Sequence, residues 1–144
     1  MSLTRREIRE KALQSLFQLS ANKDLSKEIA MREALVNNND GSEEIEEVSI
    51  PTYLNELVSG VIEQQQVIDE KIDAHLTNWS IKRLAKTDLL VMRIAVYEML
   101  FVDDVPNKVA LNEALEVIKL YSDEKSRKFV NGILSNMVNE EKED

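Results

Sequence analysis

The chain has 144 residues, of which 43% are hydrophobic and 31% are charged, a balance typical of one compact domain. It contains no cysteine, one histidine and three glycines, so it lacks a thiol nucleophile, a cysteine zinc site and a glycine-rich phosphate loop. We therefore expect a non-enzymatic protein with no cofactor and no metal. No apolar run is long enough to cross a bilayer, and the lack of cysteine suits a reducing compartment, so we expect a cytoplasmic protein without a membrane partner.

The net charge of -9 is distributed unevenly along the chain. Residues 37–75 carry one basic and ten acidic side chains, whereas residues 1–36 carry seven basic and five acidic ones. Nearly all of the acidity therefore belongs to the middle of the chain and to a short C-terminal tail. The N-terminal stretch remains basic enough to face a polyanion, despite the acidic total.

Apolar residues at helical spacing predict a first helix over residues 4–20, with Thr4 as its N-cap. A second helix is predicted to begin after Asp24. Residues 37–48 combine asparagine, aspartate and glycine with four glutamates, which predicts a mobile acidic loop with few groups to bury. Pro51 suits the first turn of a third helix.

Beyond that helix, the apolar pattern continues helically to Leu76. Residues 80–102 are hydrophobic on nearly every side, which is typical of a helix at the centre of a bundle. Pro106 must end that helix, and Asn107 is predicted to cap the next one. Ser122 followed by two acidic residues predicts the start of a last helix that reaches about Val138. The sequence indicates neither a strand nor an internal repeat.

The first helix has three arginines, Arg5, Arg6 and Arg9, near the positive end of its dipole, where cations are unfavourable by about 0.3–1 kcal/mol each. At 100° per residue, Phe17 falls on nearly the same line as Arg6, with Arg9 beside them. An anionic ligand such as a phosphate chain explains this arrangement, with the ring available to a base. The competing interpretation is a solvated basic helix end with Phe17 in the core.

The last helix has a similar pattern, because Lys125, Arg127 and Lys128 surround Phe129. Gly132 lies beside these lysines on the helical wheel and allows a partner backbone to approach. The competing interpretation is a core phenylalanine with a packing glycine. If the two basic and aromatic helix ends lie side by side, they form a groove for single-stranded nucleic acid.

Four segments together resemble the NusB family of bacterial transcription antitermination factors. They are RREIREKALQSLF (5–17), MRIAVYEM (92–99), DVPNKVALNEA (104–114) and SRKFVNGIL (126–134). The resemblance implies an all-α fold of two small helical bundles packed together, with six or seven helices in all. A single domain over residues 1–144 would then consist of an N-terminal part, about 1–79, and a C-terminal part, about 80–144.

The resemblance also implies a function. Members of this family pair with the ribosomal protein NusE, and the pair binds the boxA element of nascent RNA. The complex then joins the elongating RNA polymerase with other Nus factors and suppresses premature termination, notably on ribosomal RNA operons. The same resemblance implies a set of RNA contacts and one NusE contact, Asp88. The implied RNA contacts are Arg5, Arg6, Arg9, Phe17, Ser126, Lys128 and Phe129.

Three residues depart from the family pattern: Phe17 stands where many members have tyrosine, Asn107 stands where tyrosine is frequent, and Lys125 replaces an acidic residue of some members. The alternative function is a protein-binding helical adaptor or homodimer without RNA specificity, in which the arginines contact an acidic protein. The two functions differ in their response to salt, because RNA binding weakens steeply as salt is added and an adaptor ignores RNA.

Overall fold

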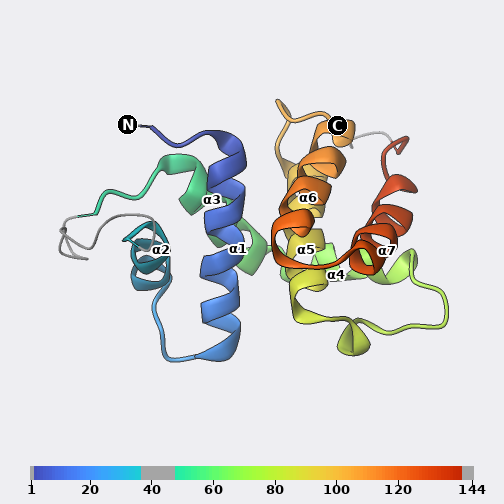
Figure 1. The fold of residues 1–144 in the computed structure, drawn as a ribbon, viewed down its shortest axis with the longest axis horizontal. Helices are drawn as coiled ribbons and strands as arrows, with labels where there is room; N and C mark the ends of the chain where they lie inside the picture. Colours follow the sequence, from blue (N-terminus) through green and yellow to red (C-terminus); the bar gives the residue numbers. More distant parts are fainter. Residues whose placement is uncertain (1, 37–47, 141–144) are drawn as a thin grey trace. The chain divides into compact units, whose positions relative to one another are not determined.

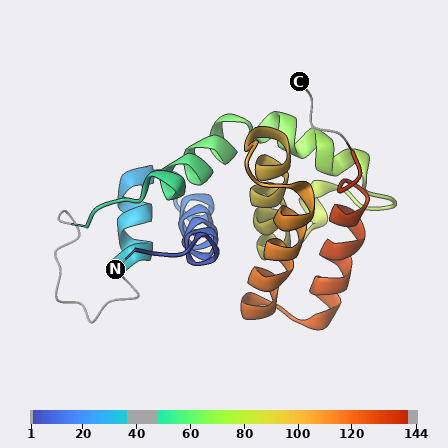
Figure 2. The ribbon, with the colours of Figure 1, turned by 90° about the horizontal axis from the view of Figure 1, so that it is seen from above.

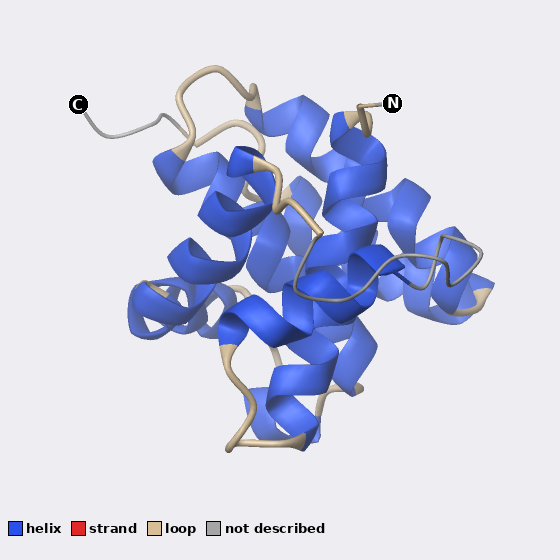
Figure 3. Ribbon diagram, turned by 90° about the vertical axis from the view of Figure 1, so that its left-hand side faces the viewer, coloured by secondary structure: helices blue, strands red, loops and turns tan. Residues whose placement is uncertain are grey.

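The computed structural model describes residues 2–36 and 48–140, and over these ranges the protein is all-α (Figure 3). The described residues form seven α-helices and one short 3-10 helix, without a strand. This confirms the predicted fold class. The chain divides into two compact units, residues 1–60 and 61–144, which are described separately below.

The first unit begins with a helical hairpin of α1 (Arg5–Ala21) and α2 (Lys27–Val36), which pack against each other (Figure 1). Thr4 is the N-cap of α1, as predicted. Its hydroxyl accepts a hydrogen bond from the Glu7 amide at 3.1 Å, and the Glu7 carboxylate accepts one from the Thr4 amide at 2.8 Å. Such a reciprocal capping box satisfies two backbone donors and fixes where the helix begins.

Helix α3 (Thr52–Glu63) starts directly after Pro51, and most of it belongs to the first unit. Lys27 Nζ of α2 donates to Ser59 Oγ of α3 at 3.1 Å. The expected mobile loop falls on residues 37–48, of which residues 37–47 lie outside the described part. Val48 is described and is buried, with its carbonyl accepting a hydrogen bond from Arg32 Nε at 3.4 Å.

The second unit contains the remaining helices. They are α4 (Gln65–Ala74), η2 (Ile81–Arg83), α5 (Lys86–Phe101), α6 (Asn107–Tyr121) and α7 (Glu124–Ser135). Helices α5, α6 and α7 pack together as a bundle, and α4 packs against α5 (Figures 1 and 2). Eleven of the sixteen residues of α5 are buried, which confirms its prediction as the central helix. No described helix is long and apolar enough to span a membrane.

An ion pair joins α5 to α4. Arg93 Nε donates to Asp69 Oδ1 at 2.8 Å, and Arg93 Nη2 donates to Asp69 Oδ2, also at 2.8 Å. Two parallel charge-assisted hydrogen bonds of this kind fix the relative rotation of the two helices as well as stabilising their contact.

Some predicted helix boundaries were wrong. The central helix begins at Lys86 rather than at residue 80, because Leu84 and Ala85 have extended backbone with ψ near 140°. Apolar spacing alone does not distinguish a helical turn from extended residues that pack. Asp123 rather than Ser122 caps α7, since its carboxylate accepts from the Ser126 amide at 2.9 Å, and α7 ends at Ser135.

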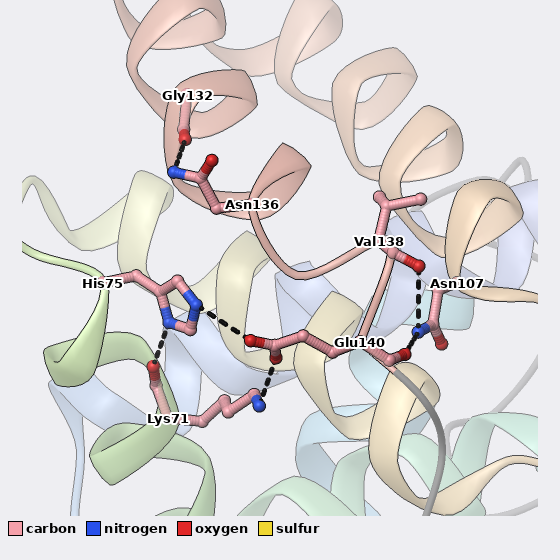
Figure 4. A network of polar contacts seen from close by, with 7 residues as sticks. All are labelled: Lys71, His75, Asn107, Gly132, Asn136, Val138 and Glu140. Carbon is pink, nitrogen blue, oxygen red and sulfur yellow. Dashed lines mark hydrogen bonds and ion pairs between the residues drawn. The ribbon is translucent and has the colours of Figure 1, made fainter.

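The prediction that Asn107 caps α6 was also wrong, because Asn107 is the first residue of the helix and Pro106 occupies the N-cap position. The Asn107 amide nitrogen instead donates to the carbonyls of Val138 and Glu140, at 3.4 and 3.0 Å (Figure 4). The Glu140 carboxylate forms ion pairs with Lys71 and with His75 Nε2 of the α4 segment, the latter at 3.3 Å. These contacts hold the last described residues against α4 and α6.

The boundary between the two units lies nearer the N-terminus than the division near residue 79 that the sequence suggested. The physical reason is the packing of α4 on α5, including the Arg93–Asp69 ion pair, which attaches α4 to the C-terminal helices.

Candidate nucleic-acid interface

The first candidate surface is the N-terminal end of α1. Arg5 and Arg6 occupy the first two helical positions and are exposed. The Arg5 guanidinium carbon lies 4.0 Å from the centroid of the Tyr53 ring, a cation–π contact that orients the side chain against α3. The Glu7–Thr4 backbone hydrogen bond lowers the pKa of Glu7, which keeps this carboxylate charged and the cap intact at neutral pH.

Two further basic residues of α1 are not at this surface. Arg9 is only 5% exposed, so it does not present its charge as the sequence pattern suggested, and Lys11 is only 1% exposed. Burial lowers the pKa of Lys11, while Glu10 and Glu7 act in the opposite direction. A helical wheel places charged residues by angle alone and does not report which angles the rest of the protein covers.

Phe17 is 45% exposed, so it is not the core residue of the competing interpretation. The apolar face of α1 is instead supplied by buried residues such as Ala12, Leu13 and Leu16. The exposed ring of Phe17 is available to stack on a planar group, although Leu13, which lies between it and Arg6 on the same line of the helix, is buried.

The second candidate surface is a pocket in the C-terminal unit. Phe129 of α7 meets Trp79, which lies in the segment between α4 and η2, with ring centroids 6.5 Å apart and planes at 67°. Trp79 is 54% exposed. The two rings border a pocket of about 200 Å³. Its lining consists of Trp79, Arg83, Leu84, Ala85, Asp88, Lys125, Ser126 and Phe129, and we call it the Trp79 pocket.

Two of the predicted RNA contacts, Ser126 and Phe129, line the Trp79 pocket, and Lys128 is exposed on the same helix. Asp88, predicted as a NusE contact, lines it as well. Asp88 Oδ2 accepts a hydrogen bond from Ser126 Oγ at 3.3 Å, while Oδ1 is buried and has no hydrogen-bond partner among the described residues. Burial raises the pKa of Asp88, Ser126 lowers it in part, and Asp123 raises it further.

Sequence reasoning placed Lys125 beside Phe129 but missed Trp79 and Arg83 as members of this pocket. The available signal was the one tryptophan of the chain, placed among polar residues, where no core is expected. Its neighbour Asn78 adopts a left-handed backbone with φ of 64°, so the segment that carries Trp79 turns sharply. Contact between residues fifty positions apart is not visible in a local pattern.

Gly132 is exposed on α7, and a Cβ atom built on it meets nothing within 4 Å in the part of the chain that the structure describes. Packing within the described residues therefore does not require a glycine at this position, which argues against the packing-glycine part of the competing interpretation. The predicted groove between the two basic helix ends draws on both units and stays a prediction.

The comparisons with known proteins agree with this all-helical arrangement. The NusB family model matches residues 6–139. The transcription antitermination protein NusB of Enterococcus faecalis is 55% identical over 141 residues, covering 96% of this chain and 91% of the relative.

Two solved structures are similar over nearly the whole chain. A structure of T. maritima NusB has a TM-score of 0.80 at 34% identity, covering 99% of this chain and 96% of that one. A crystal structure of the antitermination factors NusB and NusE in complex with double-stranded RNA has a TM-score of 0.73 at 26% identity, covering 93% and 95%. The chain therefore belongs to the NusB family, whose members are transcription antitermination factors rather than enzymes.

Proposed function

We propose that this protein binds boxA-type single-stranded RNA together with ribosomal protein NusE and joins the elongating RNA polymerase with other Nus factors. In that complex it suppresses termination in the cytoplasm, notably on ribosomal RNA operons. The two candidate surfaces supply the RNA contacts, and family membership supports the place in transcription.

The exposed ring of Phe17 is the observation that carries RNA binding. A large apolar ring is normally buried, and here it is exposed on the helix that also carries the exposed Arg6. Arginines that contact phosphates, combined with rings that stack on unpaired bases, are the usual means of holding a single strand. Arg5 and Arg6 are the stronger candidates on α1, because Arg9 has little exposed surface.

The NusE partnership is supported by the structural neighbour that contains NusB, NusE and RNA in one complex. That neighbour holds double-stranded RNA, so the proposed preference of this protein for a single strand is to be tested by comparing single-stranded and duplex RNA directly. A single strand is favoured here because bases paired in a duplex are not available to stack on exposed rings.

The test is fluorescence anisotropy of a labelled boxA RNA titrated with the protein, with and without NusE. A scrambled RNA and the same boxA sequence annealed into a duplex serve as comparison ligands. The variant is Arg6→Ala, and the control is Lys23→Ala, which removes an exposed cation beyond the end of α1. Both variants should keep the circular dichroism spectrum and melting temperature of the parent.

We expect boxA RNA to bind more tightly than the scrambled or the duplex RNA and to tighten further with NusE. Arg6→Ala should weaken binding and reduce the slope of log affinity against log salt by about one, while Lys23→Ala should change little. Equal binding of boxA and scrambled RNA would favour the adaptor function. A second copy as the partner would appear as a concentration-dependent mass in sedimentation.

A further inference from the structure

The last described residues, 137–140, contact both α4 and α6, and we call them the C-terminal strap (Figure 4). Asn107 Nδ2 of α6 donates to two backbone carbonyls of the strap, at 3.4 and 3.0 Å. The Glu140 carboxylate extends toward the α4 segment, where Lys71 Nζ and His75 Nε2 each approach one of its oxygens. An amide therefore holds the backbone of the strap, and two basic side chains hold its carboxylate.

His75 lies between two groups that only accept hydrogen bonds. Its Nδ1 lies 2.9 Å from the backbone carbonyl oxygen of Lys71, and its Nε2 lies 3.3 Å from Glu140 Oε2 (Figure 4). A carbonyl and a carboxylate have no proton to donate, so each contact requires an N–H of the ring. Neutral imidazole has one N–H and imidazolium has two. The two contacts are therefore made together by the imidazolium form of His75.

The alternative, a protonated Glu140 that donates to a neutral ring, is disfavoured by the surroundings. Hydrogen bonding to Lys71 is the largest effect on the pKa of Glu140 and lowers it, which outweighs the opposite effect of burial. His75 is also the C-cap of α4, where the negative end of the helix dipole favours a cation. The proton that secures the strap is therefore the one on His75 Nε2.

The other groups that face the strap do not provide a second switch near neutral pH. From α4, Lys71 is the charged side chain that contacts Glu140 besides His75, in the part of the chain that the structure describes. From α6 comes the neutral amide of Asn107. Helix α5 supplies apolar side chains: Val96, Met99 and Leu100. Histidine is the side chain whose charge ordinarily changes between pH 5 and 8.

The contact of the strap with the helices is incomplete. A small pocket of about 20 Å³, enough for about one water molecule, lies between the apolar wall of α5, Asn107 and Met137. Asn107 Oδ1 is buried and has no hydrogen-bond partner among the described residues. His75 and Glu140 are 16% and 39% exposed, so water can replace their contact once it is broken. Few interactions hold the strap, and the loss of one of them shifts its equilibrium toward release.

We propose that His75 is a pH-sensitive latch: its protonated ring holds the C-terminal strap through Glu140, and loss of the Nε2 proton frees the strap from α4. The strap is held most firmly in mildly acidic solution, where Glu140 is charged and His75 carries both protons. As pH rises, the neutral ring donates either to the Lys71 carbonyl or to Glu140, but not to both. Release of the strap uncovers Met137, which is 2% exposed when the latch is closed. The latch does not depend on the proposed RNA binding.

His75 is the one histidine of the chain, so its ring signal in an NMR spectrum is assigned by composition. The test follows this signal from about pH 5 to about pH 8, the range in which histidine ordinarily titrates. It also follows the hydrogen-exchange protection of the residue 140 amide, which donates to the Met137 carbonyl at 3.1 Å. Protection factors are used because they correct for the pH dependence of chemical exchange.

Two variants remove the latch in different ways. His75→Gln cannot ionise, and Glu140→Gln removes the charged acceptor while leaving the ring free to titrate. Glu70→Gln is the matched control, because it removes an exposed carboxylate of α4 that contacts Gln66. Melting temperatures show whether each variant folds, and Glu140→Gln tests the latch even if His75→Gln does not fold.

We expect the protection of the residue 140 amide to fall about two- to fivefold as the ring loses its proton, as a partly exposed ion pair provides. The ring signal and the amide protection should share one midpoint. The pH dependence should vanish in His75→Gln and in Glu140→Gln and persist in Glu70→Gln.

Three results would overturn the latch. The first is protection that stays constant while the ring titrates, and the second is a ring that keeps one charge state over the whole range. The third is the same fall in protection in a folded His75→Gln or Glu140→Gln variant, which would place the pH response elsewhere in the chain.

Discussion

Arg93 and Asp69 form a two-point ion pair between α5 and α4, with both nitrogen–oxygen distances at 2.8 Å and side chains 12% and 22% exposed. Arg93 lies in one of the segments that resemble the family, yet its position in the structure is between helices. Its contribution is therefore to the architecture of the C-terminal unit.

Replacement of Arg93 by lysine should lower the free energy of unfolding by about 1–2 kcal/mol, because lysine keeps the charge but cannot form the paired hydrogen bonds. Urea denaturation monitored by circular dichroism measures this change. RNA affinity of the folded variant should match the parent, and a variant as stable as the parent would show that the second hydrogen bond contributes nothing.

Replacement of Phe17 by alanine should weaken boxA binding by about fivefold or more, because one base–aromatic stack is worth about 1–3 kcal/mol. Stability should change little, since the ring is 45% exposed. Ile29→Ala removes a side chain of similar exposure, 41%, from α2 and is the matched control. Equal losses of affinity in the two variants would remove Phe17 from the interface.

Replacement of Lys11 by methionine should stabilise the protein at neutral pH. Burial lowers the pKa of Lys11, so its charged form destabilises the folded state at every pH below that lowered value. The penalty disappears as pH rises toward the ordinary value of 10.5, so the gain of the variant should shrink there. Thermal melts of parent and variant from neutral to alkaline pH measure this gain in stability. A variant less stable than the parent at neutral pH would contradict the explanation.

Replacement of Gly132 by alanine separates folding from binding. Alanine should stabilise α7 by about 0.5–1 kcal/mol, because a Cβ at this position meets none of the described residues within 4 Å. If a partner backbone passes this face, NusE or RNA binding should weaken at the same time. Stability is read from thermal melts and affinity from anisotropy, and unchanged affinity would show that no partner approaches Gly132.

Replacement of Glu140 by glutamine should destabilise the protein at neutral pH and reduce its sensitivity to acid. Hydrogen bonding to Lys71, followed by the charges of Lys71 and His75, lowers the pKa of Glu140. Its stabilisation is therefore present above the ordinary value of 4.5 and is lost as pH falls through the lowered value. Melting temperatures of parent and variant should converge in acid, and a constant difference at all pH values would contradict this.

Most helices were predicted from the sequence, because helix starts and apolar helix faces produce patterns within short stretches of residues. Thr4 with Glu7 three residues later marks the start of α1, and continuous apolar residues mark the buried α5. The site was predicted less completely, because it depends on which surfaces the tertiary structure covers. Arg9 and Lys11 look like surface residues from their charge, and Trp79 reaches Phe129 only through folding.

The capping box at Thr4 has a practical consequence for handling the protein. Because α1 begins at Arg5, an affinity tag joined directly before the Thr4 cap would lie beside the arginines proposed to hold RNA. A polyhistidine tag or a surface linkage there would add charge and bulk beside the proposed binding helix. Quantitative RNA measurements are therefore best made after proteolytic removal of any such tag.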